Sequence, residues 1–213
     1  MTQMDKIVVG MVIAILVMFI INAIRFYIHQ YKGRFYSYLY SNFLEYYFKY
    51  TNKNDVSTSA YLKNQIGPHK MVFNSYLNAQ KKPIHDFVTI FHSKGILVCY
   101  IVSSAGDISG KDSNAHLVIK RDGKLYQIPG PKEGIEKHVS MLKEKCGKDA
   151  PIEVCLFFKP KNTDYENVMT SYKKANYKEV TKICNEMNGS LREDEIENYY
   201  ASCTTHLVKE EKK

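Results

Sequence analysis

A chain of 213 residues has room for one ordinary domain with an attachment, and 45% hydrophobic against 24% charged residues excludes global disorder. Six prolines and eleven glycines exclude collagen-like and linker-dominated chains. Thirty basic against twenty-two acidic residues give a formal net charge of +8. This surplus favours an anionic partner, either a nucleic acid or a membrane surface.

An uncharged apolar run extends from Ile7 to Ile24 (IVVGMVIAILVMFIINAI), and Asn22 is its one strongly polar member. As a helix it would rise about 27 Å, close to the thickness of the hydrocarbon layer of a bilayer. A cleaved signal peptide would have a shorter apolar region ending in small residues, and a buried core helix would be shorter and less uniform. The sequence therefore predicts an uncleaved, single-pass transmembrane anchor over residues 1–28.

Positive charge is concentrated directly after this run. Nine basic and two acidic residues fall between Arg25 and Lys82, a net charge of +7, whereas residues 83–213 are almost balanced at +1. The positive-inside rule then places the C-terminal domain in the cytosol. A soluble basic face is the alternative, but we expect anionic headgroups to bind Arg25, Lys32, Arg34, Lys49 and Lys53. Nucleic acid is possible but not favoured, because the balanced charge of residues 83–213 gives only modest nonspecific affinity.

A basic, aromatic-rich juxtamembrane segment is expected over residues 29–58. Apolar or aromatic residues at 36, 39, 40, 43 and 47 have helical spacing and predict one amphipathic helix over residues 34–50. We expect its aromatic side chains to pack on the domain or on lipid. Residues 51–59 are polar and predict a loop.

The remainder alternates between strand-like and helix-like patterns. Helices are expected over residues 60–67, from Pro131 to about 145, over 168–187, and from a capping box at Ser190–Glu193 to about 203. Strands are expected over 71–73, 87–91, 95–103 and 152–158, with a hairpin of 117–119 and 124–128 around Arg121-Asp122-Gly123. This order predicts a mixed-sheet α/β sandwich over 59–187, followed by a C-terminal helix and charged tail over 188–213.

Five cysteines show neither a CxxC motif nor metal-ligand spacing, so no metal site is expected from them. Cys99 and Cys155 lie within apolar strand-like runs. This odd number and its pattern are typical of buried, reduced thiols in a cytosolic domain.

The run from Ile84 to Gly110, IHDFVTIFHSKGILVCYIVSSAGDISG, resembles the I-D-H-V-V-V-S-P-Y-G-I-F-V-I-E-T-K-N-Y-x-G-x-I-x-G run of the nuclease-related domain (NERD) family. The matching residues in register are Gly95, Ile96, Val98, Gly106, Ile108 and Gly110. The family's later N-P-x-x-Q-x-x-x-H stretch is similar to residues 130–138, in which Pro131 and His138 match. The resemblance covers about residues 59–187 and implies the PD-(D/E)xK nuclease fold.

The resemblance also implies where a nuclease site would lie. In the family, an Asp of the first strand and the Glu of E-x-K hold Mg²⁺, the Lys assists the attacking water, and a Gln on the next helix completes the site. Here the E-x-K positions are Tyr100 and Val102, and the Gln position is Gly134. Asp86 is the vestigial candidate for the first Asp, although strict register places Phe87 there. The resemblance therefore implies the fold and argues against the activity, with no metal and no other cofactor.

Two rearranged sites are weighed against this interpretation. Asp107, Lys111 and Asp112 follow the central strand and could supply an alternative acid and base, but a hydrophilic turn explains them better. A nuclease with a rearranged site would use Asp86, Asp107 or Lys111. His85-Asp86 could form a metal or relay pair, but a hydrogen bond at a strand edge is the commoner role. His138 on a helical face is expected to be packed or exposed to solvent.

Three functions remain for comparison. The favoured one is a membrane-anchored, catalytically inactive nuclease-like domain that acts as a binding or assembly module on the cytosolic membrane face. Its partners would be membrane lipids, through the N-terminal helix, and a membrane or cytosolic protein. The alternatives are a metal-dependent nuclease with a rearranged site acting on DNA or RNA, and a structural subunit whose fold merely resembles the family.

Overall fold

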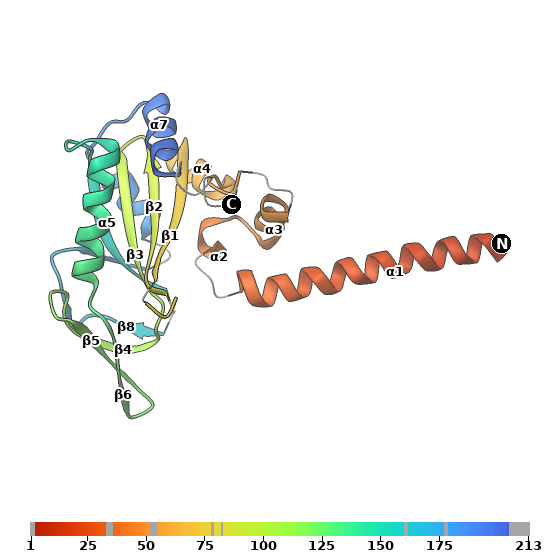
Figure 1. The fold of residues 1–213 in the computed structure, drawn as a ribbon, viewed down its shortest axis with the longest axis horizontal. Helices are drawn as coiled ribbons and strands as arrows, with labels where there is room; N and C mark the ends of the chain where they lie inside the picture. The colour runs from red at the N-terminus through yellow and green to blue at the C-terminus, as the bar shows by residue number, and fades with distance from the viewer. Residues whose placement is uncertain are drawn as a thin grey trace. The chain divides into compact units, whose positions relative to one another are not determined.

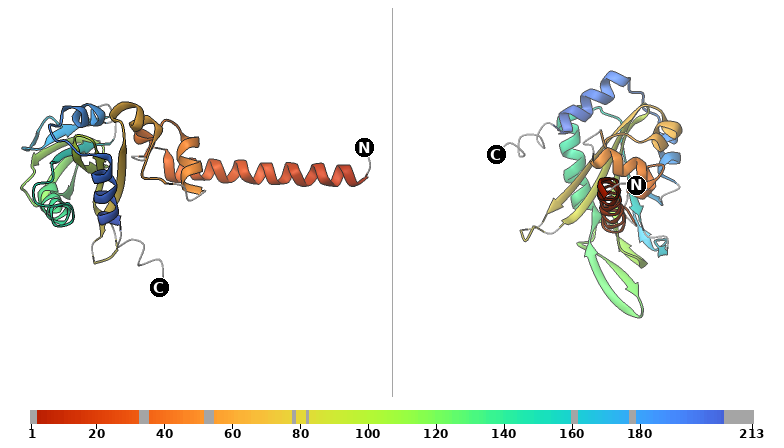
Figure 2. Two further views of the ribbon diagram at one scale, coloured as in Figure 1. Left: turned by 90° about the horizontal axis from the view of Figure 1, so that it is seen from above. Right: turned by 90° about the vertical axis from the view of Figure 1, so that its right-hand side faces the viewer.

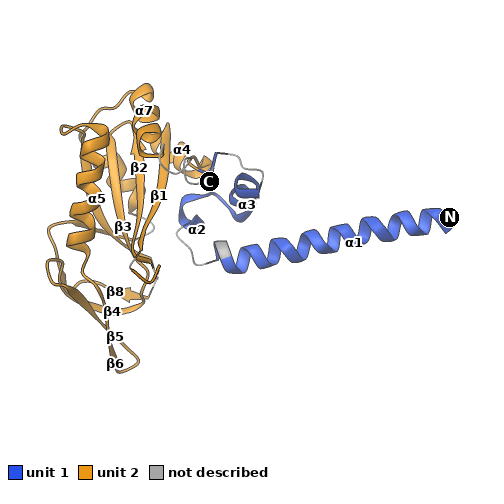
Figure 3. Cartoon of the chain, viewed as in Figure 1, with its two compact units in different colours: residues 1–56 blue, residues 57–213 orange. Residues whose placement is uncertain are grey.

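The computed structural model describes residues 3–32, 36–51, 55–77, 79–81, 83–159, 162–176 and 179–204. The chain divides into two compact units, Met1–Val56 and Ser57–Lys213 (Figure 3). Each unit is described by itself below.

The first unit begins with one long apolar helix. Helix α1 (Gln3–Phe26) continues as a π-helical turn, η1 (Tyr27–Tyr31), and no residue of α1 is buried. Its length and composition suffice to cross a membrane, as those of membrane anchors and signal sequences do. The predicted long apolar helix is therefore confirmed.

The single helix predicted over residues 34–50 is wrong, because two helices take its place. These are α2 (Tyr36–Leu39) and α3 (Phe43–Thr51). Asn42 begins α3: its side-chain Oδ1 accepts a hydrogen bond from the Glu45 backbone N–H at 2.9 Å, and Glu45 Oε2 accepts one from the Ser41 N–H at 2.9 Å. This reciprocal capping starts a new helix where the apolar periodicity alone predicted continuity.

The second unit contains two mixed sheets. In the described part of the chain, the first sheet has the order β1-β2-β3-β7-β10, with β1, β2 and β3 antiparallel and β3, β7 and β10 parallel. Its strands are β1 (His69–Leu77), β2 (Pro83–His92), β3 (Gly95–Val102), β7 (Ile152–Phe158) and β10 (Lys173–Ala175). The predicted strands over 71–73, 87–91, 95–103 and 152–158 are confirmed, and β1 extends further than expected.

Helices cover both faces of the first sheet (Figure 1). Helices α5 (Pro131–Cys146) and α7 (Glu193–Thr204) cover the face that carries Thr89, Val98 and Tyr100, which we name the α5 face. Helices α4 (Ala60–Ile66) and α6 (Val180–Glu186) lie against the opposite face, named the α6 face, which carries Leu97 and Cys99. The helices predicted over 60–67 and 131–145 are confirmed.

The second sheet carries the predicted hairpin. It has the order β6-β5-β4-β8, in which β9 also pairs with β4. Asp122 (φ 51°) and Gly123 (φ 72°) turn the chain between β5 and β6, both in the left-handed region that this tight turn requires. The hairpin projects from the sheet (Figure 2, right). The strands are β4 (Gly106–Lys111), β5 (His116–Arg121), β6 (Lys124–Pro129), β8 (Thr163–Asp164) and β9 (Val168–Met169).

The helix predicted over residues 168–187 is wrong except at its end. Val168 pairs with Gly110 in the second sheet, and Ala175 pairs with Phe157 in the first sheet. Between them, the Thr170 hydroxyl donates a hydrogen bond to Asp112 at 2.8 Å. The apolar residues that looked like one helical stripe are thus buried by different partners, and only α6 is helical.

The last helix is confirmed, but not its capping box. Helix α7 begins at Glu193, where the Glu195 carboxylate accepts a hydrogen bond from the Arg192 backbone N–H at 2.8 Å. The cap therefore lies two residues after the predicted Ser190. Helix α7 packs on α5 and on β1 within the second unit. The charged tail lies outside the described residues.

All five cysteines are free and buried. Cys99 and Cys155 are directly paired on β3 and β7, with their sulfur atoms 3.4 Å apart. Cys146 at the end of α5 and Cys203 at the end of α7 have sulfur atoms 3.9 Å apart. The expectation that Cys99 and Cys155 lie on strands is confirmed.

Truncating the centre of β3 should destabilise the second unit strongly. We expect Leu97→Ala to lower the free energy of unfolding by about 2–5 kcal/mol, because Leu97 is completely buried and its loss leaves a cavity. Urea unfolding of the full chain in detergent measures this change. Leu125→Ala is the control: this leucine of β6 is 71% exposed, and its truncation should change stability by less than about 0.5 kcal/mol. Equal effects of the two substitutions would contradict the assigned core.

Candidate functional site

The positions at which the family resemblance predicts degenerate catalytic residues include two on the α5 face of the first sheet. Tyr100 and Val102 both lie on this face near the end of β3, and they are 4% and 2% exposed. The antiparallel register places Phe87 of β2 directly opposite Tyr100. Gly134 lies in the first turn of α5 and is buried.

One histidine joins the predicted β3 and α5 positions. The His85 ring nitrogen Nδ1 lies 3.0 Å from the Tyr100 hydroxyl, a hydrogen bond across β2 and β3. Helix α5 packs over the same ring, and a Cβ atom at Gly134 would lie only 2.8 Å from it. The absence of a side chain at Gly134 therefore lets His85 pack beneath α5. The structure thus brings Tyr100 and Gly134 together around His85.

Asp86 is not part of this group. Because side chains alternate along β2, Asp86 points to the α6 face, whereas His85 and Phe87 point to the α5 face. The Asp86 carboxylate accepts a hydrogen bond of 2.6 Å from the hydroxyl of Ser75, its direct partner on β1. The position facing Tyr100 is occupied by Phe87. The structure therefore does not bring Asp86 together with Tyr100 and Val102.

A second, fully buried histidine lies beside the Phe87 ring. His138 of α5 has its Nε2 atom 2.9 Å from the Thr89 hydroxyl and its Nδ1 atom 3.0 Å from the Tyr76 hydroxyl. Its ring stacks on Phe87 with centroids 4.3 Å apart. Both ring nitrogens therefore have partners, and His138 is the packed residue that we expected as one of its two possible roles.

The sequence analysis missed the partners of His138. Thr89 is the only polar residue in the apolar stretch Phe87–Phe91, and it lies on the sheet face that α5 covers. A lone hydroxyl in a buried strand requires a hydrogen-bond partner. That requirement was the signal that could have linked Thr89 to the one histidine on the apolar side of α5.

Burial sets the protonation states of His85, Tyr100 and His138, which we call the α5-face cluster together with Phe87 and Gly134. Burial lowers the pKa of His138 to about 4. Burial also lowers the pKa of His85, although Glu133 and Asp86 oppose that shift. The pKa of Tyr100 is raised by burial and then by the Asp86 charge, so its phenol keeps its proton. The cluster thus consists of neutral hydrogen-bonding groups at neutral pH.

The residues of the alternative site have structural partners or lie exposed. Asp112 is buried and accepts a hydrogen bond from the Thr170 hydroxyl. Its backbone N–H donates a hydrogen bond of 3.0 Å to the carbonyl of Met169, at the end of β9. Asp107 and Lys111 are exposed on β4 in the second sheet, whereas Asp86 belongs to the first sheet. Asp112 and Lys111 line a surface cavity of about 310 Å³. Within the described ranges, no three His, Cys, Asp or Glu side chains are grouped to hold a metal ion.

The predicted membrane-binding cations belong to the first unit. Arg25, in the last turn of α1, and Lys32, just after η1, are exposed. Lys49 of α3 lies 3.8 Å from the Glu45 carboxylate. Arg34 and Lys53 lie outside the described residues.

Comparison of the chain with protein-family models, with curated proteins and with solved structures found no match.

Acid should destabilise the second unit through its buried histidines. The folded-state pKa of about 4 for His138 is below the ordinary value of 6.5, so the unfolded chain binds more protons between these pH values. This contribution to stability is complete above pH 6.5 and is lost as the pH falls toward 4. It amounts to at most about 3 kcal/mol. His92, whose pKa burial also lowers to about 4, adds to the effect.

Urea unfolding of the full chain at several pH values between 4 and 7 measures this loss. His138→Gln keeps hydrogen-bonding capacity but cannot take up the proton, so its stability should depend less steeply on pH than that of the wild type. His116→Gln on the exposed start of β5 is the control and should retain the wild-type slope. A wild-type slope in His138→Gln would show that this histidine is not held neutral.

Proposed function

We propose that the chain is a membrane-anchored, catalytically inactive nuclease-like domain, which acts as a binding or assembly module on the cytosolic membrane face. The observation that carries this proposal is the closed cluster on the α5 face. Phe87, Tyr100 and Gly134 occupy the three places where the NERD resemblance puts an Asp, a Glu and a Gln.

The spatial grouping of these positions supports the resemblance. A nuclease of this family would need its E-x-K strand and the following helix to meet at one site. Here Tyr100 and Gly134 are 34 positions apart in the sequence, yet Tyr100 is hydrogen-bonded to His85 and a side chain at Gly134 would collide with the same ring. Phe87, at the position of the family's first-strand Asp, is the direct partner of Tyr100 on the neighbouring strand and so lies at the same site.

The chemistry of the cluster supports inactivity. Mg²⁺ binds hard oxygen ligands, chiefly carboxylates, and a benzyl ring or a missing side chain offers none. A protonated phenol is a weak ligand, and the raised pKa of Tyr100 keeps its proton in place. Val102 cannot replace the amine of a catalytic lysine, because its side chain has neither charge nor a proton to donate. Phe87 itself stacks on the ring of His138 and offers no ligand atom.

The first unit supports the membrane attachment. Helix α1 exposes apolar side chains on all sides, which is the expected surface of a helix that is surrounded by lipid. The exposed Arg25 and Lys32 follow at its C-terminal end and favour the cytosolic orientation of the second unit. A binding module held there would meet its protein partner in two dimensions, at a raised effective concentration.

The proposal predicts no nuclease activity. Full-length protein in detergent, incubated with DNA or RNA and with Mg²⁺ or Mn²⁺, should cleave no more substrate than protein-free buffer does. Asp86→Ala should behave identically. Cleavage that requires Asp86 or Asp107 would establish the rearranged nuclease instead and refute the inactive one.

The proposal also predicts an integral membrane protein. The intact chain should stay in the membrane fraction after alkaline extraction, and its mass should include residues 1–28. Deletion of these residues should release the protein, because the described residues after α1 include no helix long and apolar enough to cross a membrane. A mature chain that begins after Ile24 would identify the apolar run as a cleaved signal and refute the anchor.

A further inference from the structure

The C-terminal end of α1 is held to α3 by a group of aromatic rings. The Phe26 ring lies 5.3 Å from the Tyr47 ring and 5.7 Å from the Tyr46 ring, measured between centroids. Phe43 and Tyr50 also lie against Phe26, at 6.2 Å and 5.0 Å. Helix α3 is thus fixed beside the end of α1, and Figures 1 and 2 show it crossing α1 instead of running along it.

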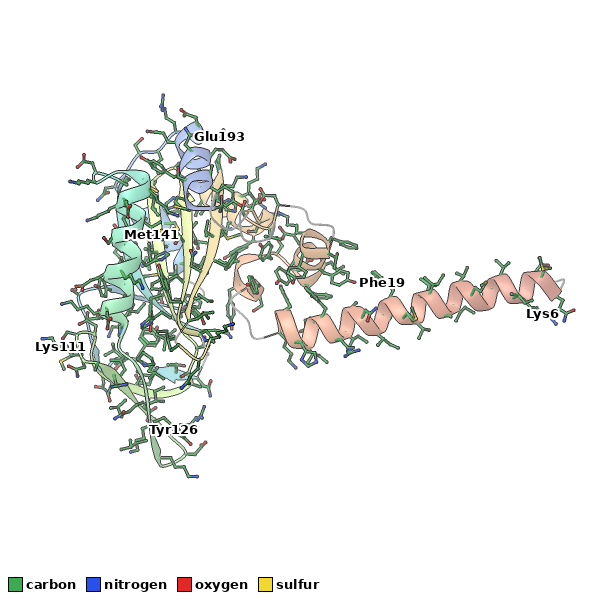
Figure 4. The ribbon with its side chains drawn as sticks, in the orientation of Figure 1. Lys6, Phe19, Lys111, Tyr126, Met141 and Glu193 are labelled. Atoms are coloured by element: carbon green, nitrogen blue, oxygen red, sulfur yellow. The ribbon has the colours of Figure 1, made fainter. Side chains whose placement is uncertain are left out.

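Two ring contacts determine how α3 is rotated about its own axis. Tyr47 contacts Phe19, 5.9 Å away, on the N-terminal side of Phe26 along α1 (Figure 4). Tyr46 contacts Tyr31, 5.5 Å away, on the C-terminal side of Phe26. The side of α3 that carries Tyr47 therefore faces the N-terminal part of α1, which is the apolar run. The side that carries Tyr46 faces the opposite direction, toward η1.

The remaining residues of α3 follow from this rotation. At about 100° per residue, Leu44 and Phe48 lie next to Tyr47 on the side away from Tyr46. Glu45 and Lys49 lie next to Tyr46 on the side away from Tyr47. Apolar side chains therefore point back along α1, whereas the charged side chains point away.

The charges on α3, and the exposure of its apolar side chains, agree with this division. Leu44 is 59% exposed and Phe48 is 48% exposed, so two large apolar side chains face solvent on one side of a short helix. On the other side, the Lys49 amine and the Glu45 carboxylate are 3.8 Å apart, and their side chains are only 24% and 14% exposed. Such an arrangement is typical of a helix at a boundary between an apolar and an aqueous phase.

The depth of α3 can be placed relative to the apolar run. Phe19 precedes the end of that run, Ile24, by five residues, or about 7.5 Å along a helix. Because Tyr47 contacts Phe19, its ring reaches that far below the end of the run. Interfacial helices bury their apolar faces about 5–10 Å into the boundary between headgroups and acyl chains.

We propose that α3 is an interfacial helix, which lies in the plane of the bilayer surface with Leu44 and Phe48 among the lipid acyl chains. This inference rests on the proposed function, because it takes α1 to span the membrane. The occupant of the exposed apolar face is lipid, since that face continues the lipid-exposed surface of α1 at the matching depth. The first unit then contacts the membrane at two places, one across it and one along its surface.

Single tryptophan variants test this arrangement, because the chain contains no tryptophan of its own. Full-length Leu16→Trp, Leu44→Trp and Lys49→Trp would each be reconstituted into vesicles of phosphatidylcholine and phosphatidylglycerol. Some vesicles would carry bromine high on the acyl chains, and others would carry it near the chain ends. Leu16→Trp reports on α1, Leu44→Trp on the apolar side of α3, and Lys49→Trp on its charged side.

We expect Leu44→Trp to emit at shorter wavelength than Lys49→Trp and to be quenched most by bromine placed high on the acyl chains. Leu16→Trp should be quenched more by the deeper bromine. Lys49→Trp should be quenched least by bromine at either depth, because Lys49 lies on the side of α3 away from the apolar run. Phe48→Trp, a conservative exchange on the same side as Leu44, should repeat the Leu44→Trp result and guards against a folding defect in a single variant.

The outcomes separate this inference from the anchor on which it rests. If Leu16→Trp is quenched by lipid bromine while Leu44→Trp and Phe48→Trp match Lys49→Trp, the anchor stands and the interfacial helix is refuted. That result would mean that protein or water covers Leu44 and Phe48. If Leu16→Trp is not quenched, α1 does not span the bilayer and the proposed membrane attachment fails as well.

Discussion

Burial of β3 on both faces is the constraint on which the second unit depends. From Ile96 to Tyr100, each residue of this strand is at most 4% exposed, with β2 and β7 hydrogen-bonded at its two edges. A strand in this position needs one helical layer over Val98 and Tyr100 and another over Leu97 and Cys99. Helices α5 and α6 supply these layers, and the rest of the second unit is arranged around them.

The same constraint explains why the α5 face carries neutral groups. A carboxylate at position 100 or an amine at position 102 would be buried, and burying a charge is costly unless a partner or a metal ion balances it. A phenol and an isopropyl group remove that cost. Tyr100 still needs a hydrogen bond, which His85 provides in the space left open by Gly134. The residues of the cluster therefore depend on one another, because exchanging one of them leaves another without its partner or its space.

Much of this fold follows from local sequence patterns. Helix α1, strands β3 and β7, helix α5 and the β5–β6 hairpin have patterns that each predict one type of secondary structure, and all are found. Prediction failed where burial came from separate partners, as with Val168 and Ala175, or where a cap interrupted a periodic run, as with Asn42. In the site, the register of β2 and β3, which the sequence did not predict, places Phe87 opposite Tyr100. The bonds from His138 to Thr89 and Tyr76 span 49 and 62 positions, so no local pattern encodes them.

The paired cysteines at the centre of the first sheet have a consequence for the chain's chemistry. The hydrogen bond to Cys155, together with burial, raises the pKa of the Cys99 thiol, and neither residue is exposed. An alkylating reagent requires an accessible thiolate, so it can reach these sulfur atoms only when β3 and β7 open. The rate at which Cys99 and Cys155 are alkylated therefore measures how often the central sheet opens, without any substitution in the chain.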